Sequence, residues 1–205
     1  IASYRNSVQL APDVADAHFN LGGALADNGD LDGAVREYRE VIRLTPDDAD
    51  AHCHLGIMLA RQGRFQDALP LLRWGHEMGS KRPDWACPSK KWLERVERTA
   101  EGERRLDQGE RPRDAVERIT VAEVLYAKSR HAESARMYAE ALAEDATLAE
   151  NVDNGYRYGA ACSASLTAAC GGADAAEWRG RALEWLRADL AAREKAPSGL
   201  VATLK

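Results

Sequence analysis

Apolar residues recur at helical spacing through the first 82 residues of the chain, in two stretches that each hold two such runs. In residues 15–48, the positions that share a helical face are Leu21, Leu25 and Ala26 in the first run and Tyr38, Val41 and Ile42 in the second. This spacing predicts two helices in each stretch, each with one buried face. Gly29 and Gly63 separate the two runs, and glycine adopts the left-handed backbone conformation that ends a helix. Pro46, followed by two aspartates, is expected to end the first stretch and to cap the next helix.

Residues 15–48 and 49–82 read as two copies of one unit. Ten positions in the first twenty residues of the two copies are identical: Ala15/Ala49, Asp16/Asp50, Ala17/Ala51, His18/His52, Leu21/Leu55, Gly22/Gly56, Leu25/Leu59, Ala26/Ala60, Gly29/Gly63 and Ala34/Ala68. A 34-residue period with a small residue after leucine, a glycine at the middle turn, an alanine in the second helix and a closing proline is the tetratricopeptide repeat (TPR) signature. The sequence therefore resembles a TPR protein.

This resemblance implies an all-α fold, a right-handed TPR superhelical solenoid of antiparallel helix pairs. One unit cannot bury its apolar stripes alone, so neighbouring units stack and share a core. Gly22 and Ala34 are expected where the two helices of a unit cross most closely, and Gly56 and Ala68 repeat this constraint. A larger side chain at such a crossing would cost ~1 to 3 kcal/mol.

The repeat register predicts the organisation of the whole chain. Its parts are 1–82, regular TPR units (1–14 as the second helix of a truncated unit, then 15–48 and 49–82); 83–112, an irregular connector with one helix that starts near Pro88-Ser89; 113–148, a degenerate TPR unit; 149–196, a terminal helix pair; and 197–205, a tail. Because residues 1–14 already follow the repeat, we expect the chain to be a fragment of a longer protein.

Charge and composition argue against several classes of function. The formal net charge of the 205 residues is −5, and acidic and basic residues are interleaved from Lys81 to Arg118, which is typical of a solvated surface rather than a nucleic-acid interface. The sequence has no run of about eighteen apolar residues, so membrane insertion is not expected. Its four cysteines are scattered and suit reduced packing residues, which predicts a cytoplasmic location.

A narrower resemblance is carried by several runs of sequence beyond the repeat consensus. They are Leu71–Pro83 (LLRWGHEMGSKRP), Pro88-Ser89, Tyr138–Ala141, Tyr158–Cys162 and Ala182–Leu190. These runs are similar to the TPR region that follows the catalytic domain in bacterial multidomain serine/threonine kinases of the planctomycete kind. The resemblance implies a larger parent with an upstream kinase domain. The sequence itself contains no Gly-x-Gly-x-x-Gly, His-Arg-Asp or Asp-Phe-Gly motif, so it cannot transfer phosphate by itself.

The sequence predicts no catalytic, cofactor-binding or metal-binding residue. His52, Cys53 and His54 are adjacent, but residues two apart on a helix point ~200° away from each other and cannot share an ion. His18 and His52 occupy the same repeat position, where a packing role is expected. No combination of nucleophile, base and oxyanion donor can be assembled from the motifs.

The candidate binding residues are those that TPR geometry places on the concave face, which the first helix of each unit lines. They are Asp16, Phe19, Asn20, Asp27, Asp50, His54, Ile57 and Arg61, with Gly23 and Cys53 at two further positions of this face. Phe19 and Cys53 stand where TPR domains that clamp a terminal carboxylate carry lysine, so that clamp is not expected. Asn20 resembles the asparagine with which TPR sugar transferases hold a peptide backbone. Trp85, outside a regular helix and expected to be exposed, is a possible anchor.

These features predict a non-catalytic scaffold that binds another protein or a peptide. One alternative is a regulatory or substrate-recruiting segment of a serine/threonine kinase, or of a TPR glycosyltransferase, whose catalytic domain lies outside this chain. A second alternative is a structural spacer or oligomerisation arm that self-associates through the truncated end of the solenoid. The flanking sequence would test the first alternative, and a size measurement would test the second.

Overall fold

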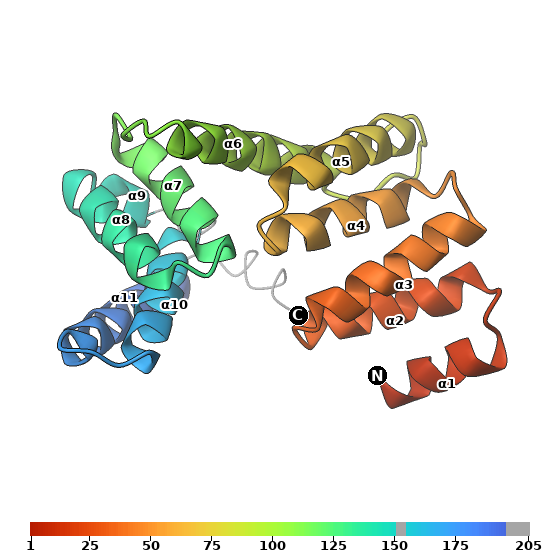
Figure 1. Cartoon of the computed structure of the whole chain (residues 1–205), viewed down its shortest axis with the longest axis horizontal. Helices are drawn as coiled ribbons and strands as arrows, with labels where there is room; N and C mark the ends of the chain where they lie inside the picture. The colour runs from red at the N-terminus through yellow and green to blue at the C-terminus, as the bar shows by residue number, and fades with distance from the viewer. Residues whose placement is uncertain (151–154, 196–205) are drawn as a thin grey trace. The chain divides into compact units, whose positions relative to one another are not determined.

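The computed structural model describes residues 1–150 and 155–195, and every regular element in these ranges is an α-helix (Figure 1). The helices are α1 (Ala2–Leu10), α2 (Ala15–Asp27), α3 (Leu31–Leu44), α4 (Ala49–Arg61), α5 (Phe65–Gly79), α6 (Ser89–Asp107), α7 (Ala115–Ala127), α8 (His131–Glu144), α9 (Thr147–Glu150), α10 (Tyr156–Ala169) and α11 (Ala175–Lys195). The predicted all-α class is confirmed. The expected tail, 197–205, lies outside the described residues.

The chain forms two compact units, which we call unit 1 (Ile1–Glu101) and unit 2 (Gly102–Lys205). The boundary between them falls inside α6. Of the helices that the structure describes, none combines the length and the apolar character needed to cross a membrane.

Unit 1 is built from antiparallel helix pairs, α2 with α3 and α4 with α5, and α3 also packs against α4 (Figure 1). Both pairs turn at glycine, since Gly29 has φ +82° and Gly63 has φ +76°. After each glycine, the backbone N–H of Asp30 or Arg64 returns to a carbonyl of the preceding helix at 2.9 Å, which closes the helix end. The carboxylate of Asp30 then caps α3, because it accepts the Gly33 N–H at 2.8 Å.

The small residues of unit 1 lie at close helix contacts, as the sequence predicts. A Cβ added at Gly56 would lie 2.7 Å from the Cγ of Leu72 and 3.2 Å from the carbonyl oxygen of Ala68. A Cβ added at Gly22 would lie 3.1 Å from the Tyr38 ring. The shared core consists of large aliphatic and aromatic side chains, among them Leu21, Leu25, Val35, Tyr38, Val41, Leu55, Leu59, Phe65 and Leu72.

Unit 2 repeats the paired arrangement with a smaller and more polar core. Helices α7 and α8 form one pair, α10 and α11 another, and α10 also packs on α8. Ser129 takes the left-handed conformation, with φ +60°, at the turn where unit 1 uses glycine. Much of the core is alanine, and it includes Ala115, Ala122, Ala135, Ala141, Ala160, Ala164, Ala168 and Ala182. Ser134, which the register aligns with Ala34, is fully buried and its hydroxyl donates to the Ala122 carbonyl at 2.7 Å.

The segment between α5 and α6 is irregular but well anchored. Helix α5 ends at Gly79 and α6 begins at Ser89, where the sequence predicts a helix start. The Trp85 ring lies directly against Gly79, leaving no room for a Cβ there, and its Nε1 donates to Ser89 Oγ at 3.2 Å. Ser89 Oγ is in turn 2.8 Å from Nδ1 of His76 on α5. The expectation that Trp85 is exposed is therefore wrong, because its ring is half-buried by these contacts.

Candidate functional site

The candidate site is the face of unit 1 formed by α2 and α4, which we call the α2–α4 face. Its centre is a cluster of four aromatic side chains. The Phe19 and His54 rings meet at 5.1 Å between centroids with their planes at 73°. Tyr38 of α3 lies 5.4 Å from Phe19 and 5.5 Å from His54. Trp92 of α6 meets His54 edge-on at 5.3 Å. Phe19 lies in the first 34-residue repeat and His54 in the second, so two predicted site residues from successive repeats of unit 1 are in contact.

The predicted residues divide by exposure into two groups. Those whose side chains are exposed are Asp16, Asn20, Asp27 and Arg61. Those that are half-buried are Phe19, Asp50, His54 and Ile57. The α2–α4 face therefore combines partly covered apolar surface with exposed polar groups of both charge signs, a mixture that suits a protein partner.

The His54 ring is oriented by its own helix. Its Nδ1 is 2.8 Å from the Asp50 carbonyl oxygen, and because a carbonyl can only accept, Nδ1 carries the proton. In the neutral imidazole, Nε2 is then the acceptor, and none of the described residues donates a hydrogen bond to it. Packing against Phe19 and Trp92 holds the ring in place.

Two further interactions set the electrostatics of this face. Burial, with a smaller contribution from the charge of Asp27, raises the pKa of Tyr38 to about 12, so its hydroxyl stays protonated. The Asp50 carboxylate accepts a hydrogen bond from Arg82 at 3.2 Å and is thus already paired. Asp16, Asp27 and Arg61 are the exposed charges among the predicted residues.

One predicted position of this face is wrong. The repeat register places Cys53 on it, yet the Cys53 side chain is fully buried and its sulfur lies against Gly75 of α5. The register aligns Cys53 with Phe19, but the two side chains meet different surroundings. Phe19 remains half-buried within the aromatic cluster, whereas Cys53 belongs to the core of the α4–α5 pair.

The histidines that the sequence assigns to packing do pack. His18 is 6% exposed, with Nδ1 2.7 Å from Glu37 and Nε2 2.9 Å from the Pro12 carbonyl. His52 stacks on Trp74 with 4.1 Å between ring centroids. Within residues 1–150 and 155–195, no group of three or more His, Cys, Asp or Glu side chains is placed to hold a metal ion.

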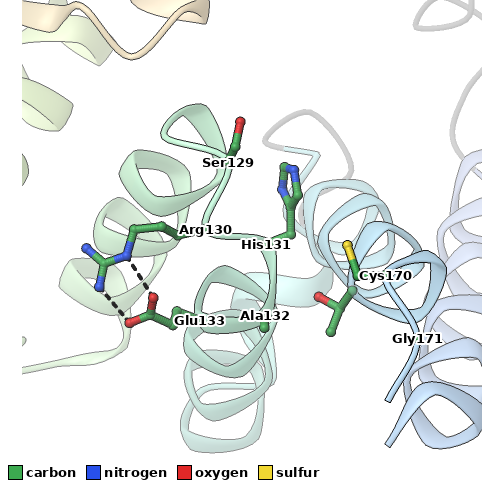
Figure 2. A pocket seen from close by; sticks show the side chains of 8 residues that line it. Ser129, Arg130, His131, Ala132, Glu133, Cys170 and Gly171 are labelled. Carbon is green, nitrogen blue, oxygen red and sulfur yellow. Dashed lines mark hydrogen bonds and ion pairs between the residues drawn. The ribbon is translucent and has the colours of Figure 1, made fainter.

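Unit 2 contains a shallow hollow that sequence reasoning missed (Figure 2). Its volume is about 300 Å³, and it is lined by Ser129, Arg130, His131, Ala132, Glu133, Thr167, Cys170 and Gly171. Arg130 binds Glu133 through two hydrogen bonds of 2.7 and 2.6 Å, so its charge is already neutralised. The hollow forms where the turn before α8 meets the end of α10. The one sequence signal is the unusual Ser-Arg-His turn before α8, which does not show that the end of α10 lies beside it.

Comparison with known proteins supports the repeat assignment in part of the chain. Residues 22–63, within α2 to α4 and the turn after it, match a family model described as a TPR repeat. That model describes a structural repeat and no catalytic domain. No curated protein matches the chain.

Several solved structures share a weak overall likeness with the chain. A crystal structure of MamA is 12% identical, with 94% of this chain and 85% of that chain covered, at a TM-score of 0.37. The structure "MamA 41-end from Desulfovibrio magneticus RS-1" is 16% identical, with 90% and 82% covered, at 0.36. YrrB, described as a TPR protein with an unusual peptide-binding site, is 14% identical, with 94% and 93% covered, also at 0.36. At such scores the fold assignment rests on the helix pairs and the repeat match. Residues 22–63 are thus similar to a tetratricopeptide repeat.

Proposed function

We propose that unit 1 binds an extended segment of a partner protein along the α2–α4 face and performs no catalysis of its own. The observation that carries this proposal is the contact between Phe19 and His54, which joins the candidate residues of the two 34-residue repeats into one surface. Asn20 and His54 occupy the same position in these two repeats and present polar atoms beside the aromatic rings.

The chemistry of the face suits a peptide main chain. An extended peptide exposes N–H and C=O groups that lose their water on binding and need partners. The Asn20 amide can both donate and accept, and Nε2 of His54 can accept. Phe19 and Ile57 offer apolar contact for side chains of the peptide. The exposed charges of both signs favour a segment of mixed polarity rather than one that is uniformly charged.

The test begins with a screen of displayed random peptides against the full chain, followed by affinity measurement on the strongest peptide. Replacing Asn20 and His54 together by Ala should weaken binding by about 1 to 3 kcal/mol, or roughly 5- to 150-fold. The matched controls are Asn6→Ala on exposed α1 and His52→Ala on the Trp74 side of α4, which should bind like the parent.

Unchanged affinity of the double variant, at parental helicity by circular dichroism, would exclude the α2–α4 face as the binding site. The Trp85 segment would then be tested next. A third outcome, equal weakening by His52→Ala and His54→Ala, would mean that loss of α4 packing and not loss of contact explains the effect.

The remaining sequence inferences stay predictions. A planctomycete-type kinase or a glycosyltransferase as parent, a cytoplasmic location, and the lack of nucleic-acid binding need the full reading frame and direct binding assays. Self-association would be tested by light scattering of the purified chain over a range of concentrations.

A further inference from the structure

Helix α2 leaves an open position in the middle of the α2–α4 face, at Gly23. Outside its own stretch of α2, the one described atom within 4 Å of a Cβ built on Gly23 is the Tyr38 hydroxyl oxygen, at 3.7 Å. That is an ordinary contact distance, so further atoms fit above Gly23. Phe19 lies one turn before Gly23 and Asp27 one turn after it, because residues four apart share a helix face. The opening is thus bordered by an aromatic ring and a carboxylate.

The Asp27 carboxylate has no ion-pair partner in the part of the chain that the structure describes, and it is exposed. Asp27 is the last residue of α2, and the last turn of this helix holds no basic residue. A negative charge is unfavourable there, because the carboxyl end of a helix dipole is itself negative. At the same position of the second repeat, α4 ends with Arg61, which has the favourable sign. A cation from outside would give α2 the compensation that α4 already has.

The other charged position of α2 shows the same contrast between the two repeats. Asp16 is exposed and has no ion-pair partner among the described residues, whereas Asp50, its equivalent on α4, is held by Arg82 at 3.2 Å. Asp16 and Asp27 are the only Asp, Glu, Lys or Arg residues of α2. The exposed charge of α2 is therefore wholly negative, while α4 carries one charge of each sign. Charge complementarity calls for a positive group on the α2 side of the face.

We propose that Phe19, Gly23 and Asp27 form a specificity site that binds an arginine side chain of the partner segment. This inference rests on the peptide binding proposed above. A planar guanidinium stacks on an aromatic ring and donates two parallel hydrogen bonds to a carboxylate, so it suits the half-buried Phe19 ring and the Asp27 carboxylate together. A lysine ammonium is a point charge and lacks both the stacking and the paired bonds.

Arg61 limits what the rest of the segment can carry. It is exposed and occupies in the second repeat the position that Asp27 has in the first. A second cation beside Arg61 would be repelled. The partner segment is therefore expected to place an arginine over α2 and a neutral or acidic residue over the end of α4.

The experiment screens a displayed library of short random peptides against the full chain and measures the affinity of the strongest peptide. We expect arginine to be enriched at one position, and its replacement by methionine to weaken binding to the parent about tenfold. Against Asp27→Asn, or against Gly23→Met, which fills the opening, the same replacement should change the affinity by less than about twofold. Asp47→Asn is the matched control, because it removes an equal charge from the exposed turn after α3; there the full dependence on arginine should remain.

The outcomes separate this site from the peptide binding on which it rests. Gly23→Met should fold, since a Cβ has room there, and parental helicity and urea midpoint check this. Peptides selected without arginine, or arginine dependence that persists in Asp27→Asn and Gly23→Met, would overturn the arginine site. If joint replacement of Asn20 and His54 by Ala still weakened binding in that case, the proposed function would stand without it. Selection of no peptide, or unchanged affinity of that double variant, would overturn both.

Discussion

Replacement of Gly75 by alanine tests whether α4 and α5 approach each other as closely as the structure shows. Gly75 lies in the middle of α5 and is buried against α4. A Cβ at this position would lie 2.5 Å from Cys53 Sγ, 2.8 Å from the Ala49 carbonyl oxygen and 3.1 Å from the Cys53 backbone nitrogen. Two of these three atoms belong to the backbone of α4 and cannot be moved by a side-chain rotation. The helices themselves must separate.

The expected magnitude follows from two opposing terms. Overpacking in a dense core costs about 1 to 3 kcal/mol, and the backbone contacts place Gly75→Ala in the upper part of that range. Alanine also favours the helix over glycine, which returns about 1 kcal/mol. We expect a net loss of about 1 to 2 kcal/mol in the free energy of unfolding.

Gly180→Ala on α11 is the matched control, because a Cβ at Gly180 meets no other atom within 4 Å. There only the helix propensity changes, so the variant should be more stable than the parent by about 0.5 to 1 kcal/mol. The assay is urea unfolding followed by circular dichroism, with hydrogen exchange of α4–α5 and α10–α11 peptides to assign each change to its unit. If Gly75→Ala stabilises the protein as Gly180→Ala does, the close α4–α5 contact does not exist in solution.

Two other predictions concern buried polar groups. Both ring nitrogens of His18 face acceptors, Glu37 and the Pro12 carbonyl. Burial lowers the pKa of His18, but these hydrogen bonds and the nearby negative charges outweigh burial and raise the pKa above 6.5. Protonated His18 therefore stabilises the folded state, and this contribution is complete below about pH 6.5 and is lost as the pH rises through the folded-state pKa. The urea midpoint should thus be higher near pH 6 than near pH 8. Glu37→Gln should shrink that difference, and an undiminished difference would assign it to other groups. In unit 2, Ser134 Oγ lies 2.9 Å from Ser163 Oγ in a fully buried pair, so Ser134→Ala should cost about 1 kcal/mol. The double replacement with Ser163→Ala should cost less than the sum of the single ones, and strict additivity in urea unfolding would contradict this coupling.

The sequence by itself determined the helices and their ends. Gly29 and Gly63 predict the two turns of unit 1, and the structure places both in the left-handed region. The start of α6 at Ser89 agrees with the position of Pro88, because proline is favoured at the start of a helix. Such features are local, since a cap, a turn or a helical period involves residues a few positions apart, and one sequence is enough to recognise them.

The tertiary structure alone decided which side chains meet. Phe19 and Cys53 share a repeat position, yet one stays at the surface in an aromatic cluster and the other is buried against Gly75. The contact between Trp85 and Gly79 is absent from any sequence motif, because it depends on how the segment after α5 folds back over that helix. The physical reason is that such contacts depend on helix crossing, on rotamers and on irregular connections, and these are settled by packing the whole unit at once.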